Sequence, residues 1–231
     1  MQPTTPEAAA PGRWIAALSR GWLVPAAGLA LVLFLVVHLA GVALAPVNPA
    51  AFERFAEVLH RQLWLPALEL LLAAALLLHP VLALWRAWLN RRAKGAMAAP
   101  LRSRRGGGLE GLSALAGRWA PWSGSLLLVF LLVHLRQLRL PRPPAGAELS
   151  ALLAALQAPA SLALYGLAGL AVMLHLLQGT ESAHRSLGWL EPANRERIRW
   201  LGRGLALLLG GGFALVPLLL VIRFPLSSGT P

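Results

Sequence analysis

Five long apolar runs decide what this chain can fold into. They cover residues 22–46, 63–85, 121–140, 159–177 and 201–222. Each is about as long as the roughly 20 residues that an α-helix needs to cross the ~30 Å hydrocarbon core of a bilayer. Since 57% of the 231 residues are hydrophobic and the mean hydropathy is +0.63, the composition is that of a membrane protein. The sequence predicts an all-α polytopic membrane protein with five transmembrane helices.

Basic residues are spread unevenly over the segments between these runs. With the N-terminus inside, the inner segments hold 15 of the 21 Lys and Arg residues. The positive-inside rule therefore predicts a cytoplasmic N-terminus and an outer C-terminus, in a multi-pass protein of the inner membrane. The net charge of +12 would suggest nucleic acid in a soluble protein. Distributed in this way, it suits anionic lipid headgroups or a protein docked on the cytoplasmic side, so we expect no nucleic-acid partner.

The remaining segments predict a simple organisation. We expect a disordered tail at residues 1–14, a membrane domain at 15–224 and a C-terminal tail at 225–231. The outer connection 47–62 has apolar residues at helical spacing, which predicts a short interfacial helix. The connection 86–118 combines arginines with three consecutive glycines and is predicted to be a flexible basic linker. The outer connection 141–158 begins with a proline-rich stretch that ends the preceding helix.

Four histidines lie deep inside four of the apolar runs, where an ionisable side chain is costly and usually functional. At 1.5 Å rise per residue, His38 and His134 lie about 24 and 20 Å from the inner edge, in the outer half of the membrane. His79 and His175 each lie about 24 Å from the outer edge, in the inner half. The depths therefore predict two pairs, His38 with His134 and His79 with His175.

Two pairs at two depths favour two b-type haems, each with its iron between two imidazoles. A single intramembrane histidine is more often a hydrogen-bonding or proton-handling residue, but four in matched pairs favour ligation. Bis-imidazole ligation leaves iron no open position, which suits electron transfer. The other histidines, His60 and His184, fall in predicted loops and are expected to be solvated or interfacial. The chain has no cysteine, which excludes disulfides, iron–sulfur ligation and covalent c-type haem attachment.

The segments around these histidines resemble the cytochrome b subunit of succinate:quinone oxidoreductases, in the five-helix, di-haem form also found in fumarate reductases. The stretches that carry the resemblance are FLVVHL at 34–39, LLLH at 76–79, SGS at 123–125 with FLLVH at 130–134, and LHLLQGTES at 174–182 with LGW at 187–189. The four histidines follow one another at spacings of 41, 55 and 41 residues. The resemblance covers nearly all of residues 15–224. It implies a di-haem four-helix bundle with one peripheral helix.

The resemblance also implies a function and partners. His79 and His175 would bind the haem nearest an iron–sulfur subunit, and His38 and His134 the distal haem. A flavoprotein subunit carrying FAD would complete a succinate dehydrogenase or fumarate reductase on the cytoplasmic face, and the substrate in the membrane would be a quinone, menaquinone. Glu53 and Glu57 are candidates for the acidic residue that relatives place near the quinone, and a solvated loop position is an equal alternative. Some relatives have a glutamate where this chain has Met173, which puts their transmembrane proton route in doubt here.

Two alternatives remain open. One is the di-haem anchor of another quinone-linked dehydrogenase or hydrogenase, although one histidine on each of four helices disfavours the arrangements usual there. The other is a haem-free transporter or scaffold that uses the histidines as a proton relay. A relay of that kind would need carboxylates beside the histidines, but only Glu69 lies within a predicted span.

Overall fold

The computed structural model describes residues 21–94 and 109–225, and in these ranges the chain is built from helices without strands. The helices are α2 (Leu23–Val42), α3 (Leu44–Val47), α4 (Pro49–His60), α5 (Leu65–Lys94), α6 (Leu109–His134), η1 (Leu135–Arg139), α7 (Glu148–Leu156), α8 (Pro159–Ser186) and α9 (Arg195–Arg223). The predicted tail 1–14 and nearly all of the predicted tail 225–231 lie outside the described residues.

Within the described ranges, five helical segments are long and apolar enough to cross a membrane. They are Leu23–Val47, Leu65–Arg92, Gly117–Arg139, Pro159–Ser186 and Arg195–Arg223. Large apolar side chains remain exposed along them, among them Leu33, Leu70 and Leu132. A helix that is apolar on every side and still exposed fits lipid as its solvent. The predicted all-α, multi-pass membrane fold with five spans is confirmed.

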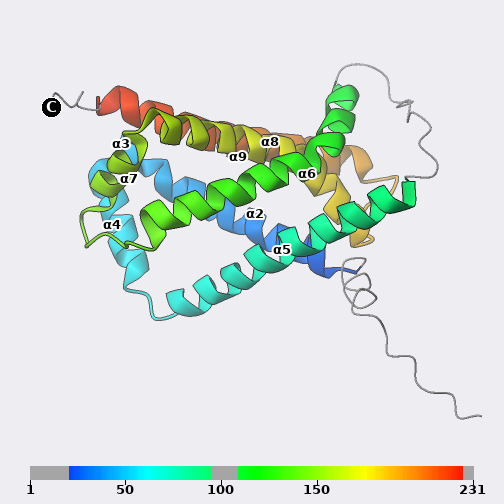
Figure 1. The fold of residues 1–231 in the computed structure, drawn as a ribbon, viewed down its shortest axis with the longest axis horizontal. Helices are drawn as coiled ribbons and strands as arrows, with labels where there is room; N and C mark the ends of the chain where they lie inside the picture. Colours follow the sequence, from blue (N-terminus) through cyan, green and yellow to red (C-terminus); the bar gives the residue numbers. More distant parts are fainter. Residues whose placement is uncertain (1–20, 95–108, 226–231) are drawn as a thin grey trace, which may run out of the picture.

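The spanning helices lie side by side as an elongated bundle (Figure 1). α2 packs mainly on α5, α6 packs on α8, and α9 lies along α8 in the most extensive contact between any two of the described helices. A Cβ atom at Gly169 would collide with Ala214 of α9, and one at Gly210 would collide with Met173 of α8. Small residues at such positions let two membrane helices approach closely. α9 therefore packs on the four histidine-bearing helices mainly through α8, with a smaller contact to α2.

The two ends of the bundle differ. One end carries the short helices α3, α4 and α7 and is called the α4–α7 end (Figure 1). At the other end α5 and α8 finish and α6 and α9 begin, and this is called the basic end. α4 confirms the helix predicted in the connection 47–62, and the Asn48 side chain caps it by accepting a hydrogen bond from the Ala51 N–H at 3.1 Å. Such a side-chain cap satisfies one of the N–H groups that a helix start leaves free.

Two connections differ from their predictions. Helix α7 lies inside the connection 141–158, for which the sequence predicted only a proline-rich stop; that stop is present, since the preceding helical turn ends before Pro141. The predicted linker 86–118 is shorter than expected, because α5 continues to Lys94 and α6 begins at Leu109. α5 thus extends past its apolar run into basic sequence, and α6 begins well before its own apolar run. The glycine-rich part of that linker lies outside the described residues.

Candidate functional site

The four intramembrane histidines meet as two pairs. The ring centres of His38 on α2 and His134 on α6 are 5.9 Å apart, with the ring planes at 79°. Those of His79 on α5 and His175 on α8 are 6.1 Å apart, at 77°. The structure therefore brings together the two pairs that the depths predicted. They are called below the His38–His134 pair and the His79–His175 pair.

The pairs lie at different levels along the bundle. His79 contacts α2 near its start, at Val24 and Gly28, whereas His38 lies near the other end of the same helix. The ten residues from Gly28 to His38 correspond to about 15 Å along the helix axis. The His79–His175 pair is thus nearer the basic end and the His38–His134 pair nearer the α4–α7 end.

Hydrogen bonds fix the ring nitrogen Nδ1 in both members of the His79–His175 pair. His79 Nδ1 lies 3.1 Å from the Val24 carbonyl oxygen, and His175 Nδ1 lies 3.3 Å from Ser123 Oγ. Because the Ser123 hydroxyl donates to the Ala120 carbonyl at 3.1 Å, its oxygen is free to accept from His175. A ring whose Nδ1–H donates in this way presents Nε2 as a basic nitrogen, the form in which histidine binds metals.

Two glycines face this same pair. A Cβ atom at Gly28 of α2 would lie 3.0 Å from His79 Cε1, and one at Gly124 of α6 would lie 3.2 Å from His175 Cε1. Both distances are tighter than ordinary van der Waals contact. The structure therefore places both glycines directly against an imidazole ring.

The His38–His134 pair is surrounded by aromatic rings. Phe34 stacks on His38 with centres 5.2 Å apart and planes at 13°, and Phe213 of α9 approaches the same ring at 5.8 Å. Phe130 lies 5.4 Å from His134, and Tyr165 lies 5.9 Å from it. In the part of the chain that the structure describes, no hydrogen bond holds Nδ1 of His38. Stacking and packing orient this ring.

A chain of side-chain hydrogen bonds leads away from His134. Its Nδ1 lies 3.3 Å from the Tyr165 hydroxyl, which donates to Gln137 Oε1 at 3.1 Å, and Gln137 Nε2 donates to Ser161 Oγ at 3.0 Å. Gln137 belongs to η1, a π-helical turn directly after His134. Such turns occur mostly at functional sites. Here the turn places Gln137 beside α8.

The sequence did not single out these supporting residues, although signals for two of them were present. Tyr165 is the only tyrosine of the chain, and it lies six residues into an apolar run. That is about 9 Å from the outer edge, close to the depth of His134. Ser123 was quoted as part of a motif without a role. A π-helical turn depends on the packing of neighbouring helices and has no signature in this sequence.

The geometry of both pairs fits an iron atom between the rings. Two imidazoles on one metal hold their centres about 6 Å apart, because each metal–nitrogen bond is about 2 Å and each nitrogen lies about 1 Å from its ring centre. Three of the four rings have Nδ1 engaged, which leaves Nε2 for a metal. Gly28 and Gly124 let the neighbouring helices approach the rings of one pair closely. The residues present therefore fit bis-histidine haem.

The candidate quinone residues Glu53 and Glu57 both have other partners. The Glu53 carboxylate accepts hydrogen bonds from the backbone N–H groups of Glu148 and Leu149, at 3.2 and 2.8 Å, and so caps the start of α7. Glu57 pairs with Arg61 one turn further along α4, at 2.5 Å. A carboxylate at a helix start is stabilised by the free N–H groups there. Glu53 thus has a structural role in joining α4 to α7.

The remaining polar candidates also form contacts away from the pairs. His60 Nδ1 lies 3.2 Å from Oε1 of the buried Glu148, at the α4–α7 end. His184, predicted in a loop, belongs to the last turn of α8, where its ring donates to the Thr180 carbonyl at 2.8 Å. Glu69 pairs with Arg139 of η1 at 2.5 Å.

Comparisons with protein-family models, with curated proteins and with solved structures gave no match. The fold and the two histidine pairs define the chain as an all-α, multi-pass membrane protein.

Proposed function

We propose that this chain is the membrane-anchor cytochrome b subunit of a succinate:quinone oxidoreductase. It passes electrons between an iron–sulfur subunit and menaquinone through two b haems, with its N-terminus and basic end in the cytoplasm. The single observation that carries the proposal is the presence of two histidine pairs at two levels, each with a ring spacing of about 6 Å that suits a shared iron.

The protein's own residues have defined tasks in this proposal. His79 and His175 hold one haem, and His38 and His134 hold the other. Hydrogen bonds from Nδ1 keep Nε2 available and raise its basicity. When bound, each haem supplies a one-electron carrier, because its iron alternates between the ferric and ferrous states.

The lipid-facing helices keep the site away from water. Exposed leucines such as Leu33 and Leu132 surround the bundle, and Phe34, Phe130 and Phe213 close around the His38–His134 pair. An apolar surrounding of this kind sets the dielectric around a redox centre and so contributes to its potential. The structure supports electron transfer along the bundle better than a proton relay, because Glu69 is already paired with Arg139.

A dithionite-reduced minus oxidised spectrum, with pyridine haemochrome quantitation on the purified chain, tests the core of this proposal. Two b haems per polypeptide are expected. Absence of haem from protein made under haem-sufficient conditions would reject the proposal and favour the haem-free alternative.

The succinate assignment needs a separate test. In membranes that contain the chain and its native partners, succinate is expected to reduce both haems, and fumarate to reoxidise them. Haems that respond to a quinol but to neither dicarboxylate would retain the di-haem anchor and assign it to another quinone-linked dehydrogenase or hydrogenase.

The orientation can be tested because the chain has no cysteine. Glu57→Cys reports on the α4–α7 end, at a partly exposed position, and Glu191→Cys reports on the basic end, at an exposed position. An impermeant thiol reagent added to intact cells is expected to label the first variant and not the second. The reverse pattern would place the basic end outside.

A further inference from the structure

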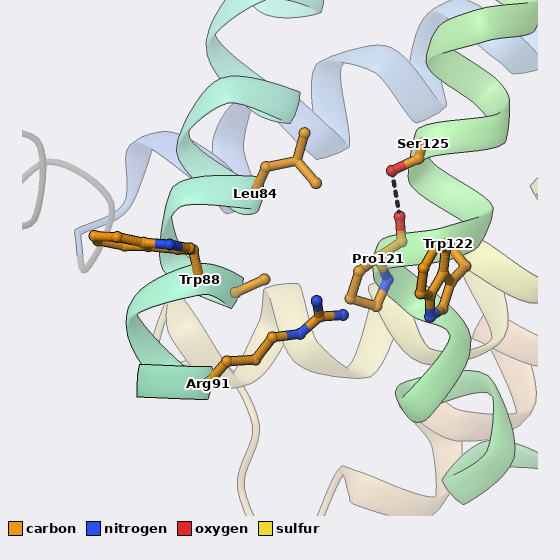
Figure 2. A pocket seen from close by; sticks show the side chains of 7 residues that line it. Leu84, Trp88, Arg91, Pro121, Trp122 and Ser125 are labelled. Atoms are coloured by element: carbon orange, nitrogen blue, oxygen red, sulfur yellow. Dashed lines mark hydrogen bonds between the residues drawn. The ribbon is translucent and has the colours of Figure 1, made fainter. Parts of the chain in front are cut away.

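A groove between α5 and α6 lies near the basic end and is separate from the four histidines. It has a volume of about 140 Å³ and is lined by Leu84, Ala87, Trp88, Arg91, Pro121, Trp122 and Ser125. Figure 2 shows these side chains, with Arg91 extending from α5 toward Pro121 and Trp122 of α6. The Ser125 hydroxyl donates to the Pro121 carbonyl at 2.8 Å. Its hydrogen is therefore already used within α6.

The groove has an apolar part and a cationic end. Leu84, Ala87 and the Pro121 ring form the apolar part, and the Arg91 guanidinium lies 6.0 Å from the centre of the Trp122 ring. No carboxylate in the part of the chain that the structure describes forms an ion pair with Arg91. A second guanidinium, that of Arg92, lies 3.9 Å above the Trp88 ring. Among the described residues, one end of the groove therefore presents positive charge with no acidic side chain paired to it.

The groove opens toward lipid. Leu84 and Trp88 are each 40% exposed and Trp122 is 61% exposed, and all three lie on helices that are apolar enough to span the membrane. Tryptophan and arginine are characteristic of the level where hydrocarbon meets headgroups. Basic pockets between transmembrane helices bind acidic lipid headgroups. The apolar part then lies on the hydrocarbon side of Arg91, where an acyl chain would run.

We propose that this groove binds one anionic phospholipid, with the lipid phosphate on Arg91 and an acyl chain against Leu84, Ala87 and Pro121. Charge complementarity selects this occupant, because an uncharged lipid or a purely apolar partner would leave the Arg91 guanidinium without a counter-ion. The proposal does not depend on haem or on a dehydrogenase partner.

Native mass spectrometry of the detergent-solubilised protein tests this site. The probes are phosphatidylglycerol and phosphatidylcholine with identical acyl chains. Arg91→Gln is expected to bind phosphatidylglycerol about fivefold more weakly than the unchanged protein, and phosphatidylcholine is expected to bind weakly to both. Arg197→Gln is the matched control, because it removes an exposed arginine from the same end, on α9, outside the groove. It is expected to retain full binding.

A second variant tests the apolar part independently of charge. Ala87→Leu adds bulk inside the groove while leaving Arg91 in place, and it is expected to weaken the binding of phosphatidylglycerol. Unchanged binding in both Arg91→Gln and Ala87→Leu, or equal binding of the two lipids, would overturn the proposal. So would a shift in a haem potential in Arg91→Gln with unchanged lipid binding, because that result would assign Arg91 to the cofactor.

Discussion

The two histidine pairs share one ring geometry but are held by different kinds of structure. The His79–His175 pair is surrounded by the Val24 carbonyl oxygen, the Ser123 hydroxyl, Gly28 and Gly124. Aromatic rings and a chain of side-chain hydrogen bonds surround the His38–His134 pair. The first pair is therefore set mainly by backbone position and the second mainly by replaceable side chains.

This difference bears on how the two sites would be tuned. A main-chain carbonyl cannot be changed without moving the helix, so His79 keeps the same hydrogen-bond partner in nearly any variant. The partner of His134 is the hydroxyl of Tyr165, which one substitution removes. Because hydrogen bonds to a ligand and burial around it set the potential of a haem, single substitutions should tune the His38–His134 site more easily.

The largest expected effect is the loss of one haem when one ligand is removed. His79→Ala or His175→Ala should remove one haem and about half of the reduced-minus-oxidised absorbance, leaving the other site intact. His38→Ala or His134→Ala should remove the other. Low-temperature spectra of the four variants should fall into two classes, matching the pairs. A variant set in which no haem is lost, or in which His79→Ala and His38→Ala give the same spectrum, would contradict the pairing.

The next effect comes from the glycines that face only the His79–His175 pair. Gly124→Val should displace His175, because even a Cβ atom would lie 3.2 Å from its Cε1. The expected result is a large loss of haem from the His79–His175 site, measured by haem quantitation, with the other site retained. Gly166→Val on α8 is the matched control, since a Cβ there meets nothing within 4 Å. Equal haem loss in both variants would show a general effect on the helices.

A smaller effect separates the two hydrogen-bond partners. Tyr165→Phe removes the acceptor of His134, which lowers the basicity of that ligand and should raise the potential of the His38–His134 haem. Ser123→Ala should raise the potential of the His79–His175 haem by less, because the Val24 carbonyl still holds His79. Spectroelectrochemical titration resolves the two potentials, and each variant should move only its own. A shift of both potentials by one substitution would mean that the two sites do not act independently.

The sequence predicted much of this arrangement, because the membrane imposes simple rules. Five apolar runs gave five spans, and a constant rise per residue gave the depths that sort His38, His79, His134 and His175 into their pairs. The ends of the elements were less accurate. α5 extends into basic sequence, where long cationic side chains reach water from a helix end, and α6 begins well before its apolar run.

The supporting structure around the pairs could not be predicted. The approach of Gly28 to His79 and the bond from His175 to Ser123 depend on how separate helices are rotated against one another. Nearly uniform apolar helices do not encode that rotation, because they have no polar face. Helix α7 was missed for a related reason, since its start is capped by Glu53 from a distant part of the chain.

The smallest expected effect tests whether the α4–α7 end handles protons for quinone chemistry next to the His38–His134 pair. Glu53→Gln keeps one acceptor oxygen for the N–H groups of Glu148 and Leu149, which donate to two carboxylate oxygens in the unchanged protein, and it cannot carry a proton. Glu53→Ala keeps no acceptor and cannot carry a proton either. Glu53→Ala should therefore cost about 1 kcal/mol of stability as a lost cap, seen as a lower Tm. If the loop serves the quinone, Glu53→Gln combined with Glu57→Gln should lower quinone turnover at an unchanged haem content and with a smaller loss of Tm than Glu53→Ala. Unchanged turnover in the double variant would leave Glu53 as a cap only, and the difference between the two pairs would then be confined to the way they hold their ligands.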